Sequence, residues 1–341
     1  MSRILVVRLG SLGDLVHALP AVAALRRAHP DAEIDWLVDA PHREWLTLVP
    51  VISSIVTLTG RTARAWLAAR RMLRERRYDV ALDFQGLIKS GALARLSGAA
   101  RVIGFDRASA REGAAAVFYG ERVEAEGGHV IEKNLRLAAR LGARTDVREF
   151  PIAPVVSPAL DTVRASLAGP FALLNPGAAW PNKRWPPQSF GRVAAHLRDR
   201  HGLRSVVLWG PGEDGAAQAV VSASAGAAIV APATRLADIV ALARAARLMV
   251  SGDTGPTHIA GAVGTPIVAL FGPTSPARNG PWDATDITLS RYEACGCHYE
   301  RTCRRGAEWC LATIRVDEVV AAIDRRLDVS ARAGRQAPAA R

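Results

Sequence analysis

The sequence predicts an α/β protein built from two Rossmann-like, doubly wound domains. Its 341 residues are about twice the usual length of one domain. Short apolar, β-rich runs alternate with helical patterns along the chain, and such alternation is typical of parallel sheets. A segment with four prolines, residues 150–170, separates two sets of these units. We therefore expect domains over residues 1–160 and 161–328, facing each other across a central cleft, and a disordered tail over 329–341.

Each expected element follows from a local pattern. Buried strands are predicted where short apolar runs occur, and helices where apolar residues recur every three or four positions. The expected strands are Ile4–Leu9, Ile34–Val38, Val80–Phe84, Phe171–Asn175, Ser205–Trp209, Leu248–Ser251 and Ile267–Phe271. The expected helices are Leu15–Ala28, Trp66–Arg77, Gly86–Leu96, Ser189–Arg200 and Leu236–Ala246. In such folds ligands bind at the loops that join strands to helices, so function is expected there.

Composition and charge exclude several classes of protein. Hydrophobic residues make up 49% and charged residues 22%, which is the composition of a folded chain. The net charge of +12 favours a polyanionic partner. No nucleic-acid-binding signature accompanies that charge, so we expect no nucleic acid partner. No signal-peptide pattern and no apolar stretch of about 18 residues occurs, which predicts a cytoplasmic protein.

A strand-to-helix loop near the N-terminus carries the first candidate residue. In the stretch Arg8-Leu-Gly-Ser-Leu-Gly-Asp14, Gly10 and Gly13 allow a tight turn and the close approach of a ligand. Asp14 stands where a helix N-cap is expected, so it is equally well explained as a cap and as a functional carboxylate. The spacing is not G-x-G-x-x-G, and a dinucleotide fingerprint is therefore not supported.

Three loops of the second half favour a bound diphosphate. One ends a strand before a helix, where backbone N–H groups near Thr254 and Gly255 form an anion cradle and His258 follows one turn later. In another loop Lys183, one of few lysines in an arginine-rich chain, can neutralise a departing diphosphate. In the third, Glu213 can accept hydrogen bonds from ribose hydroxyls, although a helix N-terminus also favours an acidic residue there.

The four cysteines lie close together near the C-terminus. They occur with His298 between residues 295 and 310, as Cys295, Cys297, Cys303 and Cys310. Four such thiols can hold a structural tetrahedral zinc or an iron. The spacing lacks paired C-x-x-C units, so reduced thiols in a surface loop are the alternative.

Several separated motifs stand in a fixed order along the chain. They are Gly10-Ser-Leu-Gly-Asp14 with His17-Ala-Leu-Pro20, Asp83-Phe-Gln-Gly-Leu-Ile-Lys-Ser90, Lys183-Arg-Trp-Pro186 and Asp253-Thr-Gly-Pro-Thr-His258. Together they resemble the ADP-heptose glycosyltransferases of lipopolysaccharide inner-core synthesis, from residue 3 to about 325. The resemblance implies the GT-B architecture, with the acceptor on the N-terminal domain and ADP-heptose on the C-terminal domain.

The resemblance also implies a role for each matching residue. Asp14 would be the general base of an inverting transfer, and Lys183 would stabilise the leaving ADP, without a catalytic metal. The nucleotide-sugar residues would be Lys183, Glu213, Asp253, Thr254, Gly255 and His258. The acceptor residues would be Ser11, Gly13, Arg61, Arg64, Gln85, Lys89 and Arg111.

The motifs divide between two subfamilies. Gln85-Gly-Leu-Ile-Lys-Ser90 and Ser109-Ala-Arg-Glu112 look like heptosyltransferase I, which acts on Kdo of lipid A. The loop with Lys183 and the cysteines look more like heptosyltransferase II, which acts on a heptosylated core. We prefer heptosyltransferase I; a non-catalytic nucleotide-sugar or lipopolysaccharide-binding protein is the alternative from another class.

An arginine-rich segment supplies a candidate surface for an anionic partner. Seven arginines lie between residues 61 and 77, opposed within that stretch only by Glu75. They are either a solvated helix face or a contact for Kdo carboxylates, lipid A phosphates or anionic lipid. On the second interpretation the protein is peripheral on the cytoplasmic face of the inner membrane.

Overall fold

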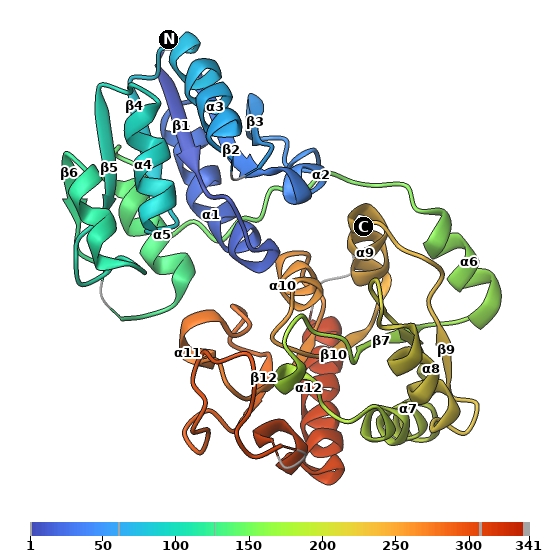
Figure 1. Ribbon diagram of the computed structural model, residues 1–341. Helices are drawn as coiled ribbons and strands as arrows, with labels where there is room; N and C mark the ends of the chain where they lie inside the picture. Colours follow the sequence, from blue (N-terminus) through green and yellow to red (C-terminus); the bar gives the residue numbers. More distant parts are fainter. Residues whose placement is uncertain (1, 61, 126, 307–308, 337–341) are drawn as a thin grey trace. The chain divides into compact units, whose positions relative to one another are not determined.

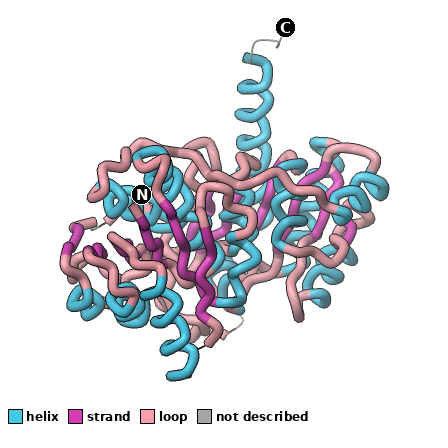
Figure 2. The backbone as a smooth tube through the Cα atoms, turned by 90° about the horizontal axis from the view of Figure 1, so that it is seen from above, coloured by secondary structure: helices cyan, strands magenta, loops and turns pink. Residues whose placement is uncertain are grey.

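Two parallel sheets of six strands each form the framework of the protein. The computed structural model describes residues 2–60, 62–125, 127–306 and 309–336 (Figure 1). The chain divides into two units, Met1–Ala153 and Pro154–Arg341. The border lies inside the proline-containing segment, seven residues before the expected border at 160. In both units, strands and helices alternate along the chain and loops join them (Figure 2).

The N-terminal unit has the strand order β3-β2-β1-β4-β5-β6, with all neighbours parallel. One part of its apolar core lies between the strands and the helices over residues 63–75 and 88–96, and includes Leu5, Val7, Leu73 and Leu93. The strands are β1 (Arg3–Val7), β2 (Glu33–Asp39), β3 (Ser54–Leu58), β4 (Val80–Asp83), β5 (Arg101–Phe105) and β6 (Glu121–Val123). The helices are α1 (Leu12–Ala28), α2 (Arg43–Leu46), α3 (Ala63–Glu75), α4 (Ile88–Leu96) and α5 (Val130–Ala139).

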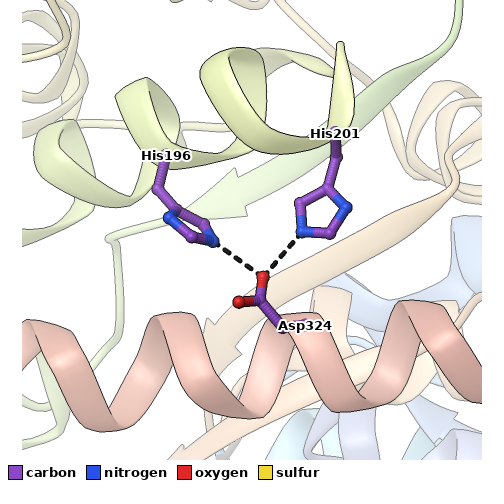
Figure 3. A group of neighbouring side chains, drawn as sticks. All are labelled: His196, His201 and Asp324. Atoms are coloured by element: carbon purple, nitrogen blue, oxygen red, sulfur yellow. Dashed lines mark hydrogen bonds and ion pairs between the residues drawn. The ribbon is translucent and has the colours of Figure 1, made fainter.

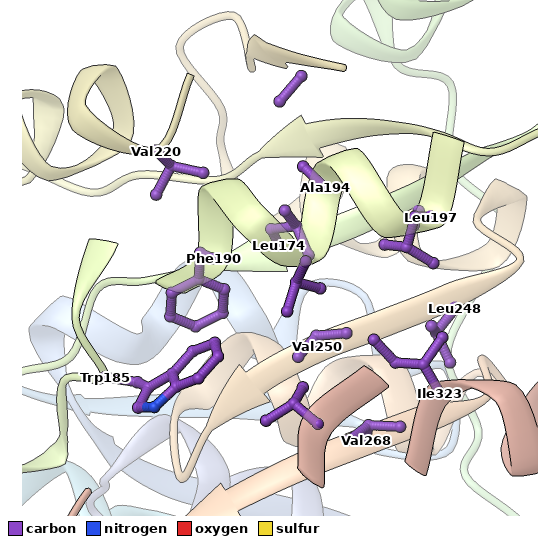
Figure 4. Packing of buried hydrophobic residues seen from close by; sticks show 14 of the residues in the cluster. Leu174, Trp185, Phe190, Ala194, Leu197, Val220, Leu248, Val250, Val268 and Ile323 are labelled. Atoms are coloured by element: carbon purple, nitrogen blue, oxygen red, sulfur yellow. The ribbon is translucent and has the colours of Figure 1, made fainter. Parts of the chain in front are cut away.

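The C-terminal unit has the strand order β12-β11-β10-β7-β8-β9, again with all neighbours parallel. Trp185 and Phe190 pack edge to face, with ring centroids 5.0 Å apart, in a core that also contains Leu174 and Ile323 (Figure 4). The strands are β7 (Phe171–Asn175), β8 (Arg204–Val207), β9 (Ala228–Val230), β10 (Leu248–Gly252), β11 (Ile267–Phe271) and β12 (Ile287–Ser290). The helices are α6 (Pro158–Leu167), α7 (Pro187–His201), α8 (Asp214–Ser222), α9 (Leu236–Ala245), α10 (Gly255–Ala262), α11 (Pro276–Asn279) and α12 (Val316–Gln336).

The two sheets share one topology. Counted from the first strand of its unit, each has the order 3-2-1-4-5-6. In this doubly wound arrangement the strand order reverses beside the first strand, and ligands bind outside the carboxyl ends of the strands at that point. The loops after β1 and β4 in one unit, and after β7 and β10 in the other, therefore occupy the binding positions of the fold.

The predicted strands and helices are confirmed with small shifts of their ends. The strands that the sequence did not reveal, β3, β5, β6, β9 and β12, are short or lie toward sheet edges. Helix α6 lies within the segment expected to be a linker, because Ser157 caps it through a hydrogen bond to Leu160 N and Pro158 occupies its first turn.

The expected disorder of residues 329–341 is wrong for its first part. Helix α12 continues to Gln336. The Ser330 hydroxyl accepts a hydrogen bond from the Arg326 guanidinium, one turn earlier, and donates one to the Arg326 backbone carbonyl. Alanine and arginine favour helix, which explains why this segment continues α12. Residues 337–341 lie outside the described residues. None of the helices within the described ranges is long and apolar enough to cross a membrane.

Candidate active site

Asp14 lies in the first turn of α1, directly after β1. Ser11 is the N-cap residue, so Asp14 is the third residue of the helix and not the cap that the sequence predicted. Its Oδ2 accepts hydrogen bonds from the Ser11 amide and hydroxyl, both at 3.2 Å, and its Oδ1 contacts the Arg8 guanidinium at 2.5 Å. Gly13 is buried in the same turn. The Asp14 side chain is 12% exposed, so this carboxylate is fixed in orientation and still reachable.

Gln85 and Lys89, two predicted acceptor residues, join the segment after β4 to the ends of two other strands. The Gln85 Oε1 accepts a hydrogen bond from Leu9 N at 2.7 Å, which joins the loop after β4 to the loop after β1. The Lys89 Nζ lies 3.1 and 3.2 Å from the carboxylate oxygens of Asp39, at the end of β2. Sequence reasoning missed Asp39, although its place at the end of a predicted strand was a usable signal.

Asp83 holds the loop that carries Gln85 and Lys89. It is fully buried, and its oxygens accept hydrogen bonds from Ser90 Oγ and Tyr119 Oη, both at 2.7 Å, and from Gln85 N at 2.8 Å. Burial raises the pKa of Asp83, and these hydrogen bonds offset part of that rise. Asp83 is therefore a structural support whose partners are all uncharged.

His42 is a second residue near Asp14 that the sequence did not reveal. A Cβ atom at Gly10 would lie 2.7 Å from the His42 ring, so the imidazole covers the loop after β1. Burial lowers the pKa of His42, and the negative charges of Asp39 and Asp14 only partly oppose this effect. A neutral imidazole thus lines the loop of the candidate base at neutral pH.

Arg111, a further predicted acceptor residue, lies in a segment that packs against the loop of Gln85. The backbone at Arg111 packs on Gly86, and Glu112 binds the same loop through Gly86 O at 2.9 Å and Ile88 N at 2.7 Å. The Ser109–Glu112 motif therefore supports the loop of Gln85, while the Arg111 side chain is exposed.

The arginine-rich segment is partly neutralised. Arg61 lies outside the described residues, and Arg64 is exposed on α3. Glu75 is the acidic residue within the stretch, and Asp35 on strand β2 also opposes these cations, because it contacts Arg76 at 2.6 Å. Such a partner, distant in sequence, is invisible in a local charge count.

In the C-terminal unit, Asp253 follows β10 and is the centre of a buried polar network. Its Oδ2 contacts the Lys183 ammonium at 2.5 Å and accepts from Thr274 Oγ1 at 2.7 Å. Its Oδ1 accepts from Asn279 Nδ2 at 2.7 Å and lies 3.1 Å from His258 Nε2. Burial alone would raise the pKa of Asp253, but His258 and Lys183 outweigh it and hold that pKa well below its usual range.

Thr254 and Gly255 form the N-terminus of α10, as predicted. Thr254 is the N-cap and Gly255 the first helical residue, with Pro256 following. The Thr254 hydroxyl is oriented by Asn175 Nδ2 and Thr257 Oγ1, both at 2.9 Å. The first backbone N–H groups of the helix, with the positive end of its dipole, make this position suited to an anion.

Lys183 lies on a loop that is held at both sides. Its ammonium sits 4.4 Å from the centroid of the Trp180 ring, and its side chain is 14% exposed. The neighbouring Asn182 donates a hydrogen bond to Glu300 O at 2.9 Å. Asp253, Trp180 and the loop at Glu300 therefore restrict the ammonium to one place.

Glu213 lies against the same loop region. It is half-buried at the start of α8, and its carboxylate accepts from Gly210 N at 3.0 Å. A Cβ atom at Gly177 would lie only 2.0 Å from its Oε2, so glycine at this position lets the carboxylate approach the backbone. The Arg184 guanidinium lies 3.9 Å from Oε1 of Glu213. Of the predicted nucleotide-sugar residues, the structure brings Lys183, Asp253 and His258 into direct contact.

The four thiols form two neighbouring pairs. Cys297 Sγ and Cys303 Sγ are 4.0 Å apart, and the thiol of Cys310 interacts with that of Cys295. Burial, followed by the contact with Cys295, raises the pKa of Cys310 to about 12. The predicted zinc or iron at these cysteines stays a prediction, which elemental analysis of the purified protein tests.

Comparisons with known proteins agree with this fold and these motifs. The family model of glycosyltransferase family 9 (heptosyltransferase) matches residues 66–307. Lipopolysaccharide heptosyltransferase 1 of Pseudomonas aeruginosa is 30% identical over 316 residues, covering 88% of this chain and 87% of that protein.

Solved structures share the fold. Escherichia coli heptosyltransferase WaaC with ADP aligns with a TM-score of 0.74 at 24% identity, covering 97% of this chain and 99% of that one. Escherichia coli heptosyltransferase II aligns with a TM-score of 0.75 at 22% identity, covering 97% and 100%. The two units therefore form the GT-B type of α/β fold, and the chain belongs to glycosyltransferase family 9, the heptosyltransferases, and is a glycosyltransferase.

Proposed function

We propose that this enzyme transfers heptose from ADP-heptose to a Kdo-containing inner-core acceptor of lipopolysaccharide, as a heptosyltransferase I. One observation carries the proposal: the two units have side chains of opposite charge directly after their first strands, β1 and β7, which are equivalent in the shared topology. A reachable carboxylate, Asp14, follows β1, and a restrained ammonium, Lys183, follows β7. The 30% identity to the Pseudomonas aeruginosa heptosyltransferase 1 supports the choice of acceptor.

In the proposed reaction Asp14 removes the proton from the acceptor hydroxyl. The hydroxyl oxygen forms a bond to the anomeric carbon of heptose while the bond from that carbon to the diphosphate oxygen breaks. The electron pair leaves with ADP, and the anomeric configuration inverts. Arg8 and Ser11 hold the Asp14 carboxylate in place, while Lys183 stabilises the charge that develops on the diphosphate. These groups supply acid–base and electrostatic catalysis without a metal in the step.

The donor site is proposed around the N-terminus of α10. The N–H groups near Thr254 and Gly255 bind the diphosphate, and Glu213 accepts hydrogen bonds from the ribose. Because Asp253 already uses both oxygens on four side chains, we interpret it as the residue that positions Lys183 and His258.

The experiment that tests the acceptor compares two substrates. The enzyme is incubated with ADP-heptose and either Kdo-bearing lipid A or the same acceptor carrying one heptose, and products are identified by mass spectrometry. We expect one heptose to be added to the Kdo acceptor only. Transfer to the heptosylated acceptor alone would establish heptosyltransferase II, which the likeness to the Escherichia coli heptosyltransferase II structure makes the second candidate. Binding of ADP-heptose without transfer to either substrate would contradict both proposed acceptors.

A contact with the anionic membrane surface is the further part of the proposal. On α3 the exposed Leu67 lies between Arg64 and Arg71, three positions before it and four after it, and Met72 is also exposed. An apolar side chain surrounded by arginines is suited to the interface of an anionic bilayer, where the guanidinium groups meet phosphates.

Vesicle sedimentation tests this contact. We expect the protein to bind vesicles that contain phosphatidylglycerol and not vesicles of phosphatidylcholine alone. Leu67→Asp should weaken binding by at least about tenfold, since burying one such side chain contributes about 1.5–3 kcal/mol. Val117→Asp, at an exposed position outside α3, is the matched control. Equal loss in both variants, or equal binding to neutral vesicles, would overturn the proposal.

A further inference from the structure

Two histidines and one aspartate converge on a single point away from the residues described above. His196 and His201 project from α7, and Asp324 projects from α12 (Figure 3). The Nε2 atoms of both imidazoles lie 2.7 Å from the same oxygen, Oδ1 of Asp324. The three atoms that could bind a metal ion, one from each side chain, lie within 4.8 Å of one another. Among the described residues, this is the one group of three or more His, Cys, Asp or Glu side chains with such a spacing.

The fold fixes this arrangement through the packing of α7 and α12. Leu197 on α7 and Ile323 on α12, each next to a member of the group, belong to the same apolar core (Figure 4). His201 is the last residue of α7, because Gly202 adopts a left-handed conformation and ends the helix. Apolar contacts in the core therefore hold α7 and α12 together, and the three polar side chains meet at the outer edge of these two helices.

The three side chains have the chemistry of transition-metal ligands. Imidazole nitrogen and carboxylate oxygen bind zinc at about 2.0–2.2 Å, which puts tetrahedral ligand atoms roughly 3.3 Å apart. The observed spacing needs only a small adjustment to reach that value. The side chains are 25%, 18% and 39% exposed in the order His196, His201 and Asp324, so an ion and one water molecule can reach them.

We propose that His196, His201 and Asp324 form a binding site for a divalent transition-metal ion such as zinc, which links α7 to α12. The site has three protein ligands and a fourth position for water. It is separate from the residues proposed for heptose transfer and does not depend on that proposal. Bound metal stabilises the C-terminal unit, since an ion that binds the folded state shifts the folding equilibrium toward it.

Zinc titration of the chelator-treated full-length protein tests the proposal. Calorimetry measures the number of zinc ions bound, which also counts any zinc at the cysteines. We expect the double variant His196→Asn/His201→Asn to bind one zinc ion fewer than the wild type at pH 7.5. The wild type should melt about 5 °C higher in zinc at 100 times its dissociation constant, and the double variant should lose that part of the shift.

Two further variants keep the test decisive. His298→Asn removes an exposed histidine near the cysteines and should leave the zinc ion at α7 and α12 in place. Asp324→Asn keeps the shape of the side chain and should weaken that zinc ion by at least about 100-fold, because even outer partners of a metal ligand contribute 10- to 100-fold. Heptose transfer without added zinc should be equal in the wild type and Asp324→Asn. The same zinc stoichiometry in the wild type, the double variant and Asp324→Asn would overturn the proposal.

Discussion

The fourth strand of each unit leads to a buried aspartate, and the two aspartates have opposite environments. Asp83 ends β4 and Asp253 follows β10, which are equivalent strands of one topology. Asp83 is surrounded by hydroxyl and amide donors, and burial raises its pKa. Asp253 contacts Lys183 and His258, and its pKa is lowered.

The difference shows how one scaffold supports two kinds of chemistry. In the N-terminal unit Asp83 accepts a hydrogen bond from Gln85 N, and the Gln85 side chain then holds the loop after β1, which leads to Asp14 in the first turn of α1. In the C-terminal unit Asp253 binds Lys183 on the loop after β7 directly. A buried aspartate with uncharged partners thus supports the segment that carries a carboxylate in one unit, while a buried aspartate with charged partners restrains a cation in the other.

The largest expected effect is on the reactive group of the N-terminal unit. Asp14→Asn should lower kcat for heptose transfer by about 10²–10⁴-fold, because an amide cannot accept the proton. The melting temperature should fall as well, because Asn keeps the hydrogen bond from Ser11 but removes the charge that pairs with the buried Arg8 guanidinium. Steady-state transfer assays and thermal melts measure the two quantities.

The control for Asp14 is the neighbouring carboxylate. Asp39 lies at the end of β2 and pairs with Lys89, so Asp39→Asn alters charge at the same sheet edge without removing the proposed base. Its kcat should fall by less than tenfold. If Asp14→Asn kept most of the activity of the wild type, Asp14 would not be the base.

The corresponding cation of the C-terminal unit should give the next largest effect. Lys183→Ala should lower kcat by about 10²–10³-fold, the range found when one group that stabilises developing charge is removed. Lys89→Ala, which removes the lysine paired with Asp39, is the matched control and should affect the acceptor KM instead. Unchanged turnover of ADP-heptose in Lys183→Ala would rule out its role at the leaving group.

The first loops of the two units were more predictable than the residues that hold them. Gly10, Asp14, Lys183 and Thr254 stand at strand ends in recognisable motifs, so sequence order alone placed them. His42 reaches Gly10 only through the turn after β2, and no local pattern announces that contact.

Partners that are distant in sequence were the main omission. Asn279 and Thr274 meet Asp253 from 26 and 21 residues away, and Asp324 meets His196 from 128 residues away. The buried strands were predicted because apolar runs suffice to identify them, whereas β6 and β9 have three residues each. The short strands and the contacts of Asn279, Thr274 and Asp324 depend on tertiary packing and not on local periodicity.

The loss of folding stability should differ between Asp253→Asn and Asp83→Asn, both in size and in its dependence on pH. Asp253→Asn removes one partner of a buried ion pair and should cost about 3–5 kcal/mol, against about 1 kcal/mol for Asp83→Asn, whose partners are neutral. Because the pKa of Asp253 is lowered, its stabilisation is present above its ordinary pKa and is lost only in strong acid. The raised pKa of Asp83 has the opposite sign: the protonated form favours folding at low pH, and this contribution is lost as pH rises through the raised pKa.

Urea unfolding between pH 5 and 8 separates these cases. The free energy of unfolding of Asp83→Asn should improve relative to the wild type as pH rises, because Asn resembles the protonated carboxyl. The deficit of Asp253→Asn should stay constant over the same range. Parallel pH profiles of the two variants would show that the two aspartates have the same role.

The smallest expected effect concerns Glu213, where binding and helix stability give different results. Glu213→Gln keeps an oxygen that can accept the hydrogen bond from Gly210 N but removes the charge. If Glu213 binds the ribose, the KM for ADP-heptose should rise by about tenfold or less with kcat unchanged, since a charged hydrogen bond exceeds a neutral one by about 1 kcal/mol. If it only complements the dipole of α8, the free energy of unfolding should fall by about 0.3–1 kcal/mol and KM should stay the same. Asp214→Asn, the next residue and the first of α8, removes a charge from the same helix end and supplies the size of that dipole effect. A KM in Glu213→Gln no different from that in Asp214→Asn would leave Lys183 and α10 as the donor contacts of this unit and remove Glu213 from the site.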